Sequence, residues 1–123
     1  MRKDLLFILV LIVIGTGVYF GTRSAGFVYD DLVTVEENLF IRDWSNLSRF
    51  FTSDYYTRAE EYSFRPLVTL TYFLDYSVWK LNPAGYHLTN LLIHLAAAVV
   101  AYFLLRRLGA GGWAGRLAAL FFL

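Results

Sequence analysis

The stretch YHLTNLLIHLAAAVVAYFLL, residues Tyr86 to Leu105, decides the fold class of this chain. It holds 20 mostly aliphatic residues with no Asp, Glu, Lys or Arg, and it is followed by Arg106 and Arg107. An α-helix needs about 20 consecutive apolar residues to span a bilayer, because each residue advances it by about 1.5 Å. The stretch therefore predicts a transmembrane helix, and the two arginines indicate its cytoplasmic end.

A second apolar run, Leu5 to Phe20, lies near the N-terminus. Extended to Gly21 it reaches the lower limit of about 17 residues for a span. A cleaved signal peptide is the alternative, because basic residues precede the run. The later span favours a retained anchor, and Gly15 and Gly17 predict the close approach of another helix.

Composition and charge place the chain among membrane proteins. Of its 123 residues, 58% are hydrophobic and 17% are charged, and no cysteine is present. The segment between the two runs holds six basic and nine acidic residues. After the second run, the charged residues of the sequence are all arginines. Basic residues gather on the cytoplasmic side, so we expect both ends inside and the acidic segment outside. The sequence has no basic patch of the kind that nucleic-acid binding requires. The absence of cysteine excludes thiol chemistry.

We expect an all-α, multi-pass membrane protein with an extracytoplasmic loop that contains interfacial amphipathic helices. The predicted parts are a tail and first span (1–26), an outer loop (27–83), a second span (84–107), and a cytoplasmic turn with the start of a third helix (108–123). That last apolar stretch is too short to span. The chain is therefore expected to be the front part of a larger protein.

The outer loop contains two segments with helical periodicity. In the first, Ser45 is a plausible N-cap, and Leu47, Phe50 and Phe51 share one face. In the second, Pro66 suits the first helical position, and leucines recur along one side until Asn82-Pro83. Both are expected at the membrane interface. Residues 52–63, between them, are polar and tyrosine-rich without clear periodicity, and are interpreted as an ordered or lid-like loop.

Two kinds of residue in the outer loop are candidates for chemistry. Asp30 and Asp31 end the sequence FVYDD (27–31), and a carboxylate beside apolar residues can act as a general base. A turn or a helix N-cap is the structural alternative. Arg65 precedes the second helix, where an anion such as phosphate is favoured. A lipid headgroup or a loop carboxylate is the other possible partner.

His87, Asn90 and His94 are spaced to share one face at the outer end of the second span. The two histidines lie about 10 Å apart along the helix axis, too far to bind one metal ion, so no metal site is predicted. Polar residues at membrane depth mark cavities or interhelical hydrogen bonds. Substrate contact and structural hydrogen bonding both remain open for these three.

The order of these motifs resembles a known family. FVYDD (27–31), FRPL (64–67), LNPAGYHLTN (81–90) and a second span with His94 resemble the N-terminal part of membrane O-mannosyltransferases that carry C-terminal tetratricopeptide repeats, and their bacterial relatives. More broadly the order is similar to glycosyltransferases of the GT-C fold, which use polyprenyl-phosphate sugars. The resemblance covers roughly residues 20–110. The chain lacks the later spans and repeats of that family.

The resemblance implies transfer of a sugar, mannose in that family, from a polyprenyl-phosphate donor to a hydroxyl of a protein or glycan on the extracytoplasmic side. Asp30 and Asp31 match the family's acidic pair, one as the base and the other as its orienting partner. Arg65, His87, Asn90 and His94 are the expected substrate-binding residues. No cofactor is implied beyond the lipid-linked donor, and metal dependence is open. We expect the bacterial inner membrane rather than the endoplasmic reticulum. A non-catalytic sensor or assembly module is the alternative function.

Overall fold

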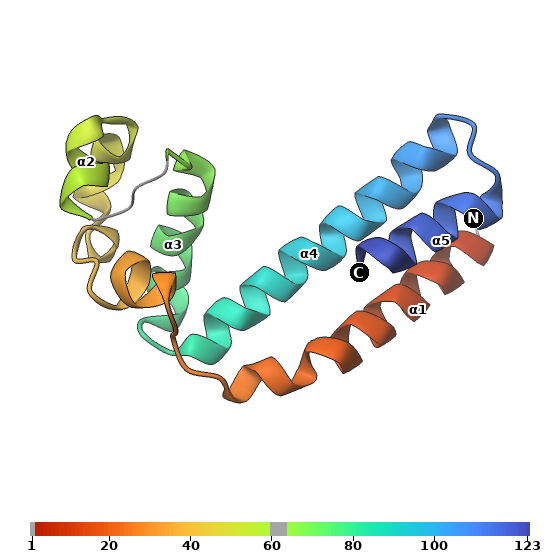
Figure 1. Cartoon of the computed structure of the whole chain (residues 1–123), viewed down its shortest axis with the longest axis horizontal. Coiled ribbons are helices and arrows are strands. Elements are labelled where there is room, and N and C mark those ends of the chain that lie inside the picture. Colours follow the sequence, from red (N-terminus) through yellow and green to blue (C-terminus); the bar gives the residue numbers. More distant parts are fainter. Residues whose placement is uncertain (1, 60–63) are drawn as a thin grey trace. The chain divides into compact units, whose positions relative to one another are not determined.

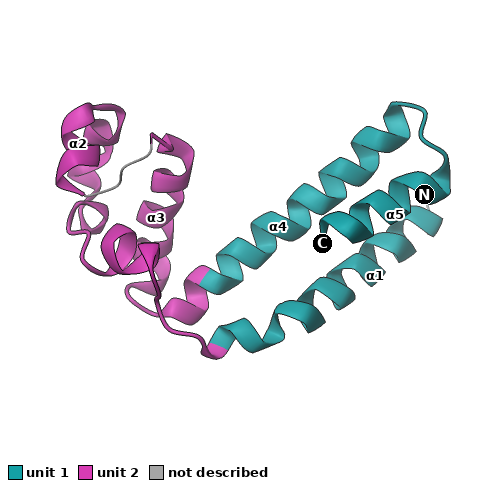
Figure 2. Cartoon of the chain, in the orientation of Figure 1, with its two compact units in different colours: residues 1–23, 87–123 teal, residues 24–86 magenta. Residues whose placement is uncertain are grey.

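In the computed structural model, which describes residues 2–59 and 64–123, every regular element within those ranges is a helix (Figure 1). The predicted all-α fold class is therefore confirmed. The chain divides into two units, one made of residues 1–23 and 87–123 and the other of residues 24–86 (Figure 2).

The first unit contains the long apolar helices. Its elements are α1 (Arg2–Tyr19), the 3₁₀ helix η1 (Phe20–Ser24), most of α4 (Pro83–Arg107), and α5 (Gly112–Phe122). The segments Arg2–Ser24 and Pro83–Arg107 are long and apolar enough to cross a membrane. Only 17% of the most apolar window of each is buried within the chain. An apolar helix that the protein itself leaves uncovered is stable when lipid surrounds it, so the chain is a membrane protein.

Side chains from α1, α4 and α5 form the core of this unit. Phe7 and Leu11 of α1, Tyr102 of α4 and Ala119 of α5 are buried together. Near the start of α1, Asp4 accepts a hydrogen bond of 2.7 Å from the Tyr102 hydroxyl and also pairs with Arg106. These contacts fix the neighbouring ends of α1 and α4.

The two glycines of α1 behave differently. A Cβ atom at Gly15 would lie 2.7 Å from a methyl carbon of Leu95 and 2.9 Å from one of Leu123. Gly15 therefore permits the close approach that the sequence predicts. Among the described residues, a Cβ at Gly17 would meet nothing within 4 Å, so within this part of the chain the same expectation is wrong for Gly17.

The second unit is built from short helices around an aromatic core. Its elements are the π-helix η2 (Leu32–Glu36), the 3₁₀ helices η3 (Phe40–Arg42) and η4 (Trp44–Phe51), and the α-helices α2 (Ser53–Arg58) and α3 (Pro66–Trp79). The buried core residues are Val35, Ile41, Phe50, Tyr55, Ala59, Phe73 and Tyr86. The Trp44 indole also donates a 2.8 Å hydrogen bond to the Ser77 hydroxyl, which ties η4 to α3.

The first outer helix differs from the prediction in its cap and its type. Asp43, not Ser45, is the N-cap of η4, and its carboxylate accepts a 2.9 Å hydrogen bond from the Ser45 backbone N–H. That bond, together with one from the Ser45 hydroxyl and the charge of Arg49, lowers the pKa of Asp43. Of the predicted face, Phe50 enters the core while Phe51 is exposed.

The segment interpreted as a loop contains a helix. Residues Ser53–Arg58 form α2, and its Tyr55 is completely buried in the core of the unit. The interpretation was wrong because a helix of 6 residues is too short to show periodicity. Residues 60–63 of the same segment lie outside the described residues.

Helix α3 begins at Pro66 as predicted but ends earlier, at Trp79, because Lys80 adopts a positive φ of 55°. Asn82 and Pro83 instead begin α4, where the Asn82 side chain accepts a 3.2 Å hydrogen bond from the Ala84 N–H. The leucine side of α3 is exposed and its polar side faces the core, where Thr69, Phe73 and Asp75 are buried. An interfacial position for this helix stays a prediction.

Candidate functional site

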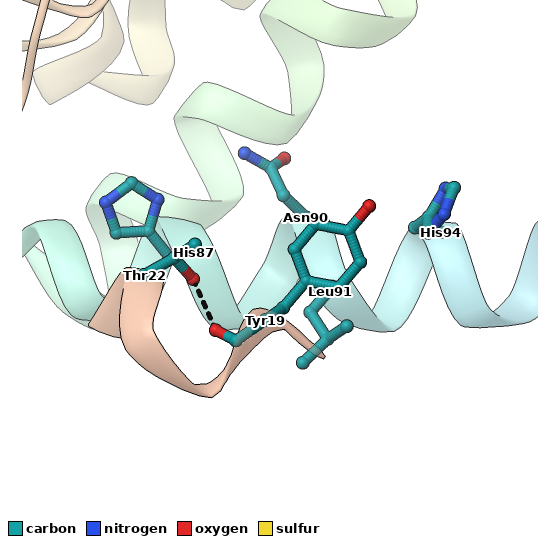
Figure 3. Close-up of a pocket in the computed structure, with 6 residues that line it drawn as sticks. All are labelled: Tyr19, Thr22, His87, Asn90, Leu91 and His94. Carbon is teal, nitrogen blue, oxygen red and sulfur yellow. Dashed lines mark hydrogen bonds between the residues drawn. The ribbon is translucent and has the colours of Figure 1, made fainter. Parts of the chain in front are cut away.

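A pocket of about 410 Å³ opens in the first unit between the end of α1 and the first half of α4 (Figure 3). All three polar residues predicted from the α4 sequence line it: His87, Asn90 and His94. Tyr19 and Thr22 complete the polar lining from the other side, with Leu91 as an apolar wall. Its volume falls within the range of about 300–1,000 Å³ that small-molecule sites occupy.

Contacts with α1 and the end of α5 hold the deeper part of this pocket in place. The Tyr19 ring meets the His94 ring edge-on, with centroids 5.8 Å apart. The backbone carbonyl of Leu123 lies 3.0 Å from His94 Nε2 and accepts a 3.2 Å hydrogen bond from the Tyr19 hydroxyl. The Phe122 ring stacks on the His94 imidazole, with ring centroids 5.2 Å apart. His94 thus has a structural role in addition to lining the pocket.

Asn90 is placed differently. It is exposed on α4, and its side-chain amide makes no hydrogen bond to any part of the chain that the structure describes. An amide that can donate and accept, set in a pocket beside imidazole and hydroxyl groups, suits a ligand rich in hydroxyls. Within residues 2–59 and 64–123, no group of three potential metal-ligating side chains gathers at one place.

Asp30 and Asp31 lie in the second unit, at the start of η2. Asp31 occupies the N-cap position of η2, but its side chain makes no capping hydrogen bond. Thr34 donates a 2.9 Å hydrogen bond to the backbone carbonyl of Asp30, not to its carboxylate. Asp30 is exposed and Asp31 is half-buried. Among the described residues, neither carboxylate makes a hydrogen bond or an ion pair, although Asp31 has the position of a cap.

The residue before this pair has an uncommon backbone. Tyr29 has a φ of 56°, and its side chain is 90% exposed. A bulky residue in the left-handed region is strained, and such strain is concentrated at functional sites. The strained turn places the two carboxylates directly after it, with the Asp31 N–H donating to the Val28 carbonyl at 3.2 Å.

Arg65 is the N-cap of α3 and is exposed. Its backbone carbonyl accepts hydrogen bonds from the N–H and the hydroxyl of Thr69, at 3.0 and 3.2 Å. No ion pair among the described residues joins its guanidinium to Asp30 or Asp31. The structure thus brings His87, Asn90 and His94 together in the first unit, and it places the acidic pair and Arg65 in the second.

The sequence of this chain resembles curated proteins over most of its length. It is 33% identical over 120 residues to the protein O-mannosyl-transferase Tmtc3 of Drosophila melanogaster, which covers 90% of this chain. The chain is similar to the TMTC protein O-mannosyl-transferases. Mouse TMTC2 is 33% identical over 81% of this chain, and human TMTC2 is 35% identical over 73%.

The similarity to the TMTC family confirms the resemblance that the motif order indicates. The chain spans only 13% of the length of Drosophila Tmtc3 and 11% of human TMTC2. No protein-family model and no solved structure matches the chain.

Sequence reasoning missed Tyr19 and Thr22 as parts of the pocket. Both stand at the end of an apolar run, where tyrosine and threonine are common without any site. It also missed a buried polar network in the second unit. There Asn38 Nδ2 donates to the Tyr55 hydroxyl at 3.0 Å and to the Thr34 carbonyl at 3.1 Å. No local pattern signals such a network, because its partners lie on different elements.

Proposed function

We propose that this chain is the N-terminal part of a GT-C-type membrane glycosyltransferase, one that transfers mannose from a polyprenyl-phosphate donor to a hydroxyl group of a protein. The observation that carries the proposal is the similarity to Tmtc3, which extends over 90% of the chain. Two helices that can cross a membrane support a lipid-linked donor, because such a donor is itself held in the bilayer.

In the proposed reaction, the acceptor hydroxyl oxygen attacks C1 of the sugar. The bond between C1 and the phosphate oxygen breaks, and the polyprenyl phosphate leaves with the electron pair. One carboxylate of the pair Asp30 and Asp31 takes the hydroxyl proton, and configuration at C1 inverts. A positioned general base typically contributes about 10²–10⁴-fold to the rate. The unused carboxylates and the strained turn at Tyr29 support this assignment.

The pocket of the first unit is proposed to bind polar groups of the donor. Its hydroxyl, amide and imidazole groups match the hydroxyls of a sugar, and none of the described residues that line it carries a carboxylate that would repel a phosphate. Arg65 is proposed to bind phosphate oxygens, since it lies at the N-terminus of α3. The charge distribution supports an extracytoplasmic site, because the acidic loop is flanked by spans with basic cytoplasmic ends. We propose the bacterial inner membrane as its location.

The donor class is tested with the full-length protein in proteoliposomes. Polyprenyl-phosphate mannose, polyprenyl-phosphate glucose and a nucleotide-linked mannose are offered with a peptide rich in serine and threonine. Transfer from the polyprenyl-phosphate mannose alone is the expected result. Transfer from the nucleotide-linked sugar without a lipid-linked intermediate would contradict the proposal. Repeating the assay with a chelator shows whether a divalent metal ion is required.

The pocket is tested by Asn90→Leu, which removes the amide but keeps the size of the side chain. We expect the KM for the donor to rise while kcat is largely kept, because the amide is assigned to binding. Leu92→Ala is the matched control, since Leu92 is exposed on the same helix and does not line the pocket. Equal effects of the two substitutions would remove the pocket from the proposal.

One observation favours a second function, a non-catalytic sensor or assembly module. Asp30 is exposed and Asp31 only half-buried within the described structure, whereas a general base is commonly held away from bulk water. If no donor supports transfer, and Asp30→Asn with Asp31→Asn leaves the protein's cellular function unchanged, the module is the better account.

A further inference from the structure

A groove of about 340 Å³ runs between α1 and α5 in the first unit, apart from the pocket described above. Its lining combines two cations, Lys3 and Arg116, with apolar side chains from both helices. The two helices run in the same direction (Figure 1); Lys3 is the second residue of α1, and Arg116 lies in the N-terminal half of α5. The groove therefore has one basic end and continues as an apolar channel.

The basic end has a donor without a partner. The Nε atom of Arg116 is buried and has no hydrogen-bond acceptor among the described residues. The guanidinium carbon of Arg116 lies 5.7 Å from the ring centroid of Phe7 and 5.9 Å from that of Trp113. These rings can attract the cation, but they give the Nε–H no oxygen acceptor. A buried donor that lacks an acceptor is costly. An oxygen supplied from outside the chain would relieve that cost once the side chains that cover Nε move aside.

Among the residues that the structure describes, no carboxylate lines the groove, so its two positive charges are not neutralised by these walls. A phosphate offers several acceptor oxygens and a negative charge, and the planar fork of arginine binds such a group well. The ligand chemistry that the basic end selects is therefore a phosphate ester.

The rest of the groove selects an apolar chain. Leu6 and Leu117 are 64% and 51% exposed, and Val10 and Leu120 continue the same wall. Lys3 and Val10 are about 10 Å apart along α1, which gives the apolar part the reach of a partial acyl chain. Apolar side chains exposed on a helix that can cross a membrane suit contact with lipid.

We propose that this groove is a binding site for one anionic phospholipid, with its phosphate at Lys3 and Arg116 and an acyl chain between α1 and α5. The argument for this occupant is charge complementarity, since both lining charges are positive and the Arg116 guanidinium has a donor with no acceptor among the described residues. Basic pockets between transmembrane helices bind anionic headgroups for this reason. The site is independent of the proposed transferase activity.

The test uses the full-length protein in neutral detergent and native mass spectrometry. Phosphatidylglycerol and phosphatidylcholine with identical acyl chains are titrated as probes. We expect phosphatidylglycerol to bind more tightly, by about fivefold for each cation, which corresponds to about 1 kcal/mol. Arg116→Gln and Lys3→Gln should each lose about that factor, and Leu117→Trp, which keeps both charges but obstructs the groove, should weaken both lipids.

Arg107→Gln is the matched control. Arg107 is exposed and does not line the groove. It lies at the same end of the unit as Lys3, since its neighbour Arg106 pairs with Asp4 of α1. Arg107→Gln should leave lipid binding unchanged. Three results would overturn the proposal: equal binding of the two lipids, an equal loss in Arg107→Gln, or no retained lipid because another helix of the protein fills the groove. Each variant's melting temperature is recorded, so that a folding defect is recognised separately.

Discussion

Gly85 provides the sharpest test of the packing in the second unit. It is the third residue of α4, within the LNPAGYHLTN motif, and the side chain of Trp79 at the end of α3 lies directly over it. A Cβ atom at Gly85 would lie 2.2 Å from Trp79 Cγ, 2.4 Å from Cδ2 and 2.6 Å from Cβ. The substitution Gly85→Ala is therefore expected to destabilise the protein.

The expected change in the free energy of unfolding is the sum of two opposing contributions. Non-bonded carbon atoms normally stay about 3.5–4.0 Å apart, so the indole must move by more than about 1 Å. Because the Trp79 Cβ atom is also too close, rotating the ring cannot relieve the overlap, and the backbone must shift. Such overpacking typically costs about 1–3 kcal/mol, and a shift of this size belongs at the upper end. Alanine regains about 0.5–1 kcal/mol of helix preference. The net loss is about 1–2.5 kcal/mol.

The free energy of unfolding is measured in mixed micelles by titration with a denaturing detergent, followed by tryptophan fluorescence and helical circular dichroism. Gly17→Ala is the matched control, because it gives the same gain in helix preference at a position where a Cβ meets nothing within 4 Å. It should not lose stability. If Gly85→Ala is as stable as Gly17→Ala, the close packing of Trp79 on α4 is wrong.

Two further predictions concern buried and capping interactions of the second unit. Tyr55→Phe removes the hydroxyl that accepts from Asn38 and should lower the free energy of unfolding by about 1–2 kcal/mol, whereas Tyr29→Phe, at an exposed side chain, should change nothing. Equal stability of the two variants would contradict the network. The pKa of Asp43 is lowered by the Ser45 N–H, so its contribution to stability is present above the ordinary Asp pKa and is lost as pH falls below about 4. Asp43→Asn keeps an acceptor but cannot titrate, so its unfolding free energy should depend less on pH there; identical pH profiles for the two proteins would refute this role.

The long helices were predictable because their signal is local. Apolar runs bounded by basic residues or by Pro and Gly define α1, α4 and α3 without knowledge of their neighbours. The short elements were not predictable in the same way. Helix α2 is polar and brief, and it is held by one buried side chain, Tyr55, whose partners are distant in sequence. The π-helix η2 has no sequence pattern that distinguishes it from an ordinary turn.

The same distinction holds for the candidate pocket. The spacing of His87, Asn90 and His94 is enough to place them on one side of α4. The contributions of Tyr19 and Thr22 depend on α1 lying beside α4, a pairing across about 70 residues of intervening sequence that no local pattern encodes. For the acidic pair, the sequence left capping and catalysis open, and only the structure shows that the Asp31 carboxylate makes no capping hydrogen bond.

Whether the acidic pair takes the proton in sugar transfer is tested by comparing three substitutions at equal expression. Asp30→Asn and Asp31→Asn keep the size of each side chain and remove its basicity. Asp54→Asn is the control, because Asp54 is an exposed carboxylate of the same unit whose ion pair with Arg58 contributes little. With the full-length protein and polyprenyl-phosphate mannose, at least one of the first two should lower kcat by about 10²–10⁴-fold, while Asp54→Asn keeps the wild-type rate. Transfer at the wild-type rate in both Asp30→Asn and Asp31→Asn would contradict the claim.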